Sequence, residues 1–202
     1  MSRFIEEAIA KAGMSPVLAA RRAGDFEAVR TTVSSWGKAD LLVLGAVADT
    51  VRVEDVGATV RIHEHALRGA APGDAEITWV DASVYPSELE FLRAVAVARI
   101  AALGGPRPRI GVDWSKCGME LAQVALGFGA SELRGPITRK SGLPIYADEK
   151  LKVKGQGMVE LASIKRQEIG ALVTHAGRLP VFVEIEEESP RARESSQEVA
   201  GV

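Results

Sequence analysis

The segment from Phe91 to Gly135 constrains the fold more than any other part of the chain. Its first part is alanine-rich and almost wholly apolar, which predicts a buried helix over Phe91–Leu103. Gly104-Gly105-Pro106 ends this helix, because glycine permits the terminal turn and proline cannot continue it. The pattern then predicts a strand, a second helix and a short strand: Arg109–Trp114, Met119–Phe128 and Ser131–Leu133. This order is a βαβ unit, so we predict a parallel sheet with a right-handed crossover.

The remaining segments extend this α/β pattern on both sides. Helices are predicted at Ser2–Ala12, Ser15–Arg22, Asp25–Ser34, Lys38–Val53 and Gln156–His175. Further strands are predicted at Ala58–Glu64, Glu76–Asp81 and Leu179–Ile185. We therefore expect an α/β fold, an abbreviated (β/α) barrel-like parallel sheet of about five strands with N-terminal helices. The expected organisation is a helical segment over 1–57, a partial (β/α) barrel over 58–185 and a disordered acidic and polar tail over 186–202.

Composition argues against several classes of protein. The formal net charge is −2, so nothing in the overall balance indicates nucleic acid or acidic lipid as a partner. The single cysteine, Cys117, excludes an internal disulfide and any zinc or iron–sulfur site built from several cysteines of one chain. No apolar run reaches membrane-spanning length, and the N-terminus does not have the pattern of a signal peptide. We expect a cytoplasmic protein without a membrane partner.

An ordered set of residues in the central segment carries a family resemblance. They stand at Ala96–Ile100, Pro108–Ile110, Trp114, Gly118, Ala122–Leu126, Phe128–Ala130, Leu133 and Gly135. This pattern resembles the distal part of the radical S-adenosylmethionine enzymes of the futalosine route to menaquinone, aminofutalosine synthase and dehypoxanthine futalosine cyclase. The deazaflavin (FO) synthase family is a close relative of both. Asp40–Arg52 also resembles a helix that precedes the barrel in these enzymes.

The chain departs from this family where the radical chemistry begins. In the family, the strand equivalent to Ala58–Glu64 leads to a CxxxCxxC loop, whose thiolates hold the 4Fe-4S cluster that cleaves S-adenosylmethionine. Here residues 65–74 follow and contain no cysteine, and the next strand resembles one from late in the family barrel. The resemblance therefore implies a truncated relative that lacks the middle of the barrel. We predict no cofactor. Because the cysteine triad is missing, a non-catalytic protein is the favoured interpretation.

The resemblance also implies a binding function near menaquinone biosynthesis. The expected partner is a nucleoside-like ligand or a full-length paralogue, and the ligand-binding residues carried over from the family are Asp113, Trp114, Glu120 and Gln123. Packing between strand and helix is an equal interpretation of Trp114. A partial barrel has open strand edges, so we also expect closure, a homodimer or pairing with another chain. A structural subunit that completes another protein's sheet is one alternative function.

A metal-dependent hydrolase or lyase is the other alternative. His63 and His65 lie two residues apart on a predicted strand, so both imidazoles point to one face and can meet one metal ion. Asp81, at the end of a strand expected to be adjacent, would add a carboxylate. A solvated strand end is the simpler interpretation. Cys117, beside Lys116 and ahead of a helix, has the setting of a reactive thiol, and a structural cysteine is again the simpler interpretation.

Overall fold

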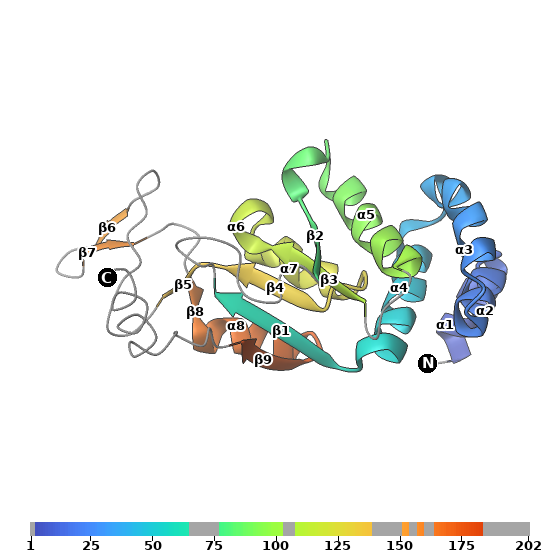
Figure 1. Ribbon diagram of the computed structural model, residues 1–202. Coiled ribbons are helices and arrows are strands. Elements are labelled where there is room, and N and C mark those ends of the chain that lie inside the picture. The colour runs from blue at the N-terminus through green and yellow to red at the C-terminus, as the bar shows by residue number, and fades with distance from the viewer. Residues whose placement is uncertain are drawn as a thin grey trace, which may run out of the picture.

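Five parallel strands form the central sheet of this protein, in the order β2-β3-β4-β1-β9 (Figure 1). The computed structural model describes residues 3–64, 77–102, 108–138, 151–153, 157–159 and 164–183. The strands of the sheet are β1 (Thr59–Glu64), β2 (Ile77–Val80), β3 (Arg109–Asp113), β4 (Glu132–Gly135) and β9 (Leu179–Val183). The predicted α/β class, with a parallel sheet of about five strands, is confirmed.

Several of the helices begin at a capping side chain. They are α1 (Arg3–Lys11), α2 (Ser15–Ala23), α3 (Phe26–Thr32), α4 (Leu41–Val56), α5 (Glu88–Ala101), α6 (Trp114–Cys117), α7 (Met119–Leu126) and α8 (Arg166–His175). Asp25, Asp40 and Ser87 accept hydrogen bonds from backbone N–H groups in the first turns of α3, α4 and α5. In the part of the chain that the structure describes, no helix has the length and apolar character needed to cross a membrane.

The predicted βαβ unit is present. β3 and β4 are parallel neighbours, with Val112 opposite Leu133, and α6 and α7 connect them. β2, α5 and β3 make a second unit of the same kind, with Val80 opposite Val112. Each unit moves the chain one strand along the sheet, because a helical crossover returns the next strand parallel to the last.

β1 does not lie beside β2, its neighbour in sequence. It lies between β4 and β9, with Ile62 opposite both Leu133 and Phe182. Among the described residues, β2 and β9 are the edge strands of an open sheet. The N–H of Leu179 donates to Ala58 O, just before β1. In a parallel ladder the backbone nitrogen of Pro180 therefore faces the open edge, where its missing N–H leaves no donor for a further strand.

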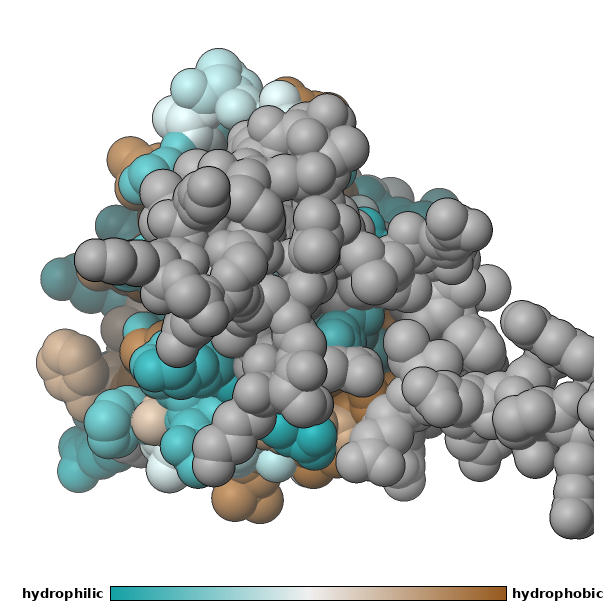
Figure 2. Space-filling view, turned by 90° about the vertical axis from the view of Figure 1, so that its left-hand side faces the viewer, coloured by the Kyte–Doolittle hydropathy of each residue, from teal (hydrophilic) through white to brown (hydrophobic). Residues whose placement is uncertain are grey.

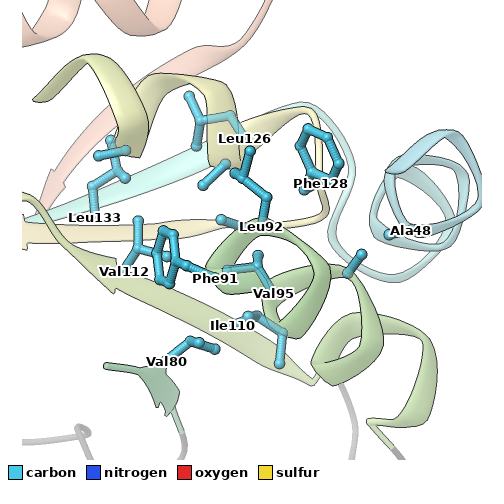
Figure 3. Packing of buried hydrophobic residues seen from close by; sticks show 14 of the residues in the cluster. Ala48, Val80, Phe91, Leu92, Val95, Ile110, Val112, Leu126, Phe128 and Leu133 are labelled. Carbon is cyan, nitrogen blue, oxygen red and sulfur yellow. The ribbon is translucent and has the colours of Figure 1, made fainter. Parts of the chain in front are cut away.

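The two faces of the sheet differ sharply in character. One, the helix face, is covered by α5, α7 and α8 and carries Val60, Ile62, Val80, Ile110, Val112, Leu133 and Phe182. Figure 3 shows Phe91 and Val95 of α5 packed against Ile110 and Val112 of β3. The same hydrophobic cluster includes Ile9 of α1 and other residues of the N-terminal helices, which therefore share one core with the sheet.

One predicted helix is shorter than expected. The prediction over Gln156–His175 is wrong in its first half, where short strands β7 (Gly157–Val159) and β8 (Ile164–Lys165) occur. β7 pairs with β6 (Leu151–Val153), and β8 pairs with β5 (Ile137–Thr138). Helix α8 begins only after Lys165, whose backbone N–H donates to the Glu168 side chain. The described residues before this cap form strands instead of a helix. The predicted tail, 186–202, lies outside the described residues.

Arg99 of α5 connects several segments at the end of the sheet where the strands begin. Its fully buried guanidinium donates to Gly129 O at 2.8 Å, to Pro108 O at 2.5 Å and to Ser131 Oγ at 2.8 Å. Asp55 of α4 lies 3.5 Å away. Burial lowers the pKa of Arg99 to about 10, against the opposing charge of Asp55, so the side chain stays charged at neutral pH. One side chain thus joins α4 and α5 to the segments that precede β3 and β4.

Replacing Arg99 tests this arrangement. We expect Arg99→Met to lower the free energy of unfolding by about 3 kcal/mol or more, because it leaves buried oxygens and the Asp55 carboxylate without their donor. Urea unfolding followed by circular dichroism measures the change. The control is Arg3→Met, since the Arg3 side chain is 92% exposed and its loss should change stability by less than about 0.5 kcal/mol. Equal effects of the two substitutions would contradict the role of Arg99.

Candidate functional site

Charged and aromatic side chains cover the other face of the sheet. The strand register places Trp79, Gly111, Glu132 and Arg61 in one row across β2, β3, β4 and β1. The next row toward the strand ends contains Asp113, Arg134 and His63. We call these residues of the two rows the polar face. Parallel sheets bind ligands at the carboxyl ends of their strands, so this is the candidate functional site.

An ion pair stacked on an indole ring forms one half of the polar face. Arg134 Nε lies 3.0 Å from Asp113 Oδ2, and the Arg134 guanidinium carbon lies 4.2 Å from the centroid of Trp79. Trp79 crosses directly over Gly111, where a Cβ atom would lie 2.4 Å from the ring. The other oxygen of Asp113 accepts the N–H and the hydroxyl of Ser115, which fixes the carboxylate at the start of α6. The result is an ion pair held against an aromatic ring at the end of β3.

A buried histidine–carboxylate pair forms the other half. His63 Nε2 lies 2.7 Å from Glu132 Oε2, and the two residues are only 7% and 2% exposed. The imidazole also meets the edge of Trp79, with ring centroids 5.7 Å apart at an angle of 82°. Arg61 Nε lies 3.9 Å from the same Glu132 oxygen. His63 and Arg61 thus lie around one carboxylate oxygen, as burial of a charge requires.

The structure separates the four residues predicted to bind the ligand. Asp113 lies on the polar face, as described above. Trp114 points to the helix face, where it is 1% exposed and covers Gly135, so it packs the core. Glu120 is exposed on α7, and Gln123 donates to Leu172 O of α8 at 3.2 Å. Of the four, only Asp113 belongs to the candidate site.

Sequence reasoning missed most of the polar face, although a signal was present. Arg61 and His63 are two residues apart and flank Ile62, and Glu132 and Arg134 flank Leu133 in the same way. This spacing puts both members of each pair on one face of a strand. The pairing of His63 with Glu132 joins residues 69 positions apart, which no local pattern indicates.

The predicted metal site does not form from the residues that the structure describes. The expected adjacency of its two strands is wrong, because β3 and β4 lie between β1 and β2. Neighbouring strands are about 4.8 Å apart, so His63 and Asp81 are on backbones about 14 Å apart. Asp81 instead binds Lys116 and Ser83, whose hydrogen bonds lower the pKa of the carboxyl to about 2. His65 lies outside the described residues, and among those described no cluster of histidine, cysteine, aspartate and glutamate suits a metal.

Cys117 is held in a setting that suppresses its thiolate. Burial, and then the negative charge of Asp113, raise the pKa of the thiol to about 11. The sulfur lies 3.3 Å from Asp113 O, where the thiol donates a weak hydrogen bond. A 4Fe-4S cluster of the family type needs three thiolates, so the donor set of this chain does not fit that group. The structural interpretation of Cys117 is the one that its surroundings favour.

The side of the molecule to which β1 and β4 point is seen in Figure 2. The described surface on this side shows hydrophilic residues with several hydrophobic ones among them. No protein-family model matches this chain, and no curated protein sequence matches it. The likeness to the futalosine-pathway enzymes therefore rests on the sequence motifs alone.

Substitution of Gly111 tests whether the Trp79 ring packs directly over this residue. We expect Gly111→Ala to lower the free energy of unfolding by about 1–3 kcal/mol, because the new methyl group overlaps the indole ring and displaces it. The control is Gly170→Ala in α8, where the nearest atom lies 3.9 Å from the added Cβ and alanine favours the helix by about 0.5–1 kcal/mol. Urea unfolding should therefore show opposite signs for the two variants. A Gly111→Ala protein as stable as the parent would show that Trp79 is not seated there.

Alkylation kinetics test the thiol. At pH 8 we expect iodoacetamide to modify folded Cys117 roughly a hundredfold more slowly than the urea-unfolded chain, because a pKa near 11 leaves little thiolate. The pH profile separates this cause from simple burial. The rate in the unfolded chain should level off above its ordinary pKa, while that of the folded protein should keep rising beyond about pH 10. Coincident profiles would refute the raised pKa.

Proposed function

We propose that this chain is a cytoplasmic binding protein related to the futalosine-pathway radical enzymes but without their radical chemistry, and that its polar face binds a nucleoside-like molecule. The observation that carries the proposal is the stack of Arg134 on Trp79 beside the Asp113 carboxylate, at the strand ends where such sheets bind ligands.

The chemistry of this stack suits a nucleoside. Planar bases bind to aromatic rings and to arginine guanidinium planes by stacking. Buried carboxylates such as Asp113 and Glu132 accept hydrogen bonds from ribose hydroxyl groups or from ring N–H groups. Side chains that already hydrogen-bond to one another lose little conformational freedom when a ligand binds, which favours affinity.

The strand order supports the kinship. β1, the first strand of the sheet in sequence, lies beside β9, the last strand in sequence. The first and last strands of a closed (β/α) barrel are neighbours in the same way. Loss of the middle of such a barrel would bring β2 to the open edge, which is its position here.

Native mass spectrometry of the protein, purified without oxygen from its own host, tests the proposal. We expect a co-purified molecule of nucleoside mass, and we expect adenosine or inosine to compete for its place. Arg134→Gln should weaken binding at least about tenfold, because it removes the stacked cation. Arg30→Gln is the control, since it makes the same charge change at an exposed position of α3.

Other outcomes separate the alternatives. A complex with a larger, cysteine-bearing relative would make that protein, and not a nucleoside, the partner. A bare monomer to which no nucleoside in a panel binds would contradict the proposal, and retention of one metal ion per chain would favour a hydrolase or lyase.

A further inference from the structure

The Glu132–His63 pair has a chemical use that ligand binding alone does not require. Glu132 is 2% exposed and accepts the Nε2 proton of His63 across 2.7 Å, so the carboxylate fixes both the orientation and the tautomer of the ring. In the neutral imidazole of this tautomer, Nδ1 carries the lone pair. Among the described residues, no group hydrogen-bonds to Nδ1. A histidine oriented in this way by a carboxylate is the arrangement of a general base.

The neighbours of the pair complete the setting. The imidazole of His63 makes an edge-to-face contact with the Trp79 ring, and Arg134 is opposite His63 in the strand register. Arg61, with its side chain 33% exposed, lies 3.9 Å from the Glu132 oxygen that also binds His63. A guanidinium beside the base supplies positive charge for an oxyanion that develops during reaction. These groups are held by rigid strands, which keep a proton acceptor and a cation at a fixed separation.

We propose that the Glu132–His63 pair is an acid–base site, in which His63 Nδ1 acts as a metal-free general base toward water in the hydrolysis of carboxylic esters. Water gives a proton to Nδ1 as its oxygen bonds to the acyl carbon. The bond from that carbon to the leaving oxygen then breaks, and the proton on Nδ1 passes to the leaving group or to solvent. His63 is the catalytic residue, and Glu132 is a positioning residue that acts through it. This activity goes beyond nucleoside binding.

Hydrolysis of 4-nitrophenyl acetate by the full-length chain tests the proposal. We expect release of 4-nitrophenolate above the buffer rate, and we expect this rate to be unaffected by EDTA. His63→Gln should lower the protein-dependent rate at least about tenfold. His175→Gln is the matched control, because His175 is exposed at the end of α8, and it should change the rate less than about twofold.

Glu132→Gln separates positioning from structure. It keeps the shape of the side chain, so we expect kcat to fall roughly tenfold while KM and the urea midpoint change little. If His63→Gln fails to fold, diethyl pyrocarbonate replaces it as the probe on the parent protein. Loss of the esterase rate in step with modification of His63, followed by peptide mass spectrometry, supports the proposal.

Several results would overturn it. These are the absence of a rate above buffer, an unchanged rate in folded His63→Gln, loss of the rate with EDTA, or inactivation that follows modification of another residue. The assay contains no nucleoside, so its outcome is independent of whether the polar face binds one.

Discussion

The buried guanidinium of Arg99 is the interaction on which the arrangement of this fold depends. It reaches from α5 to Pro108 O, Gly129 O and Ser131 Oγ, where the chain enters β3 and β4. A buried charge costs several kcal/mol unless it is fully paired, so these partners have to keep their positions. Gly129 has a positive φ of 96°, and a Cβ there would lie 2.7 Å from the Arg99 side chain. The glycine therefore permits both the turn and the close approach of Arg99.

Ion pairs between structural elements lie at the end of the sheet where the strands begin, and the polar face lies toward the other end. Where the strands begin, Arg99 shares Asp55 with Arg21 of α2, and Arg52 and Arg178 share Asp49. These ion pairs join α2, α4 and α5 to one another and join α4 to Arg178, the residue before β9. Toward the other end of the strands, Trp79, Asp113, Arg134, His63 and Glu132 converge on one face of the sheet. Parallel sheets are usually covered on both faces, so a face of buried charged groups indicates a use for them.

The elements of the fold were largely predictable, since local patterns decide them. Asp25, Asp40 and Ser87 marked helix starts, and the apolar run after Phe91 marked the central helix. The prediction over Gln156–His175 failed in its first half because β7 pairs there with β6 and β8 pairs with β5, a strand distant in sequence. Of the polar face, the sequence predicted Asp113 as a ligand-binding residue and His63 as a metal ligand. Trp114, the residue after Asp113, faces the other side of the sheet and packs in the core. The missed side chains, Trp79, Glu132, Arg134 and Arg61, come from β2, β4 and β1, which only the sheet order brings together.

The sequence by itself determined the α/β class, the βαβ unit and the lack of the cysteines that family radical chemistry needs, because composition and periodicity suffice for each. The tertiary structure alone decided that β1 lies beside β4. That one placement puts His63 against Glu132, a pair that the sequence did not predict, and separates His63 from Asp81, with which the sequence had grouped it. The physical reason is that strand order depends on how buried surfaces and ion pairs fit across the whole core, and such contacts between distant residues leave no periodic trace in the chain.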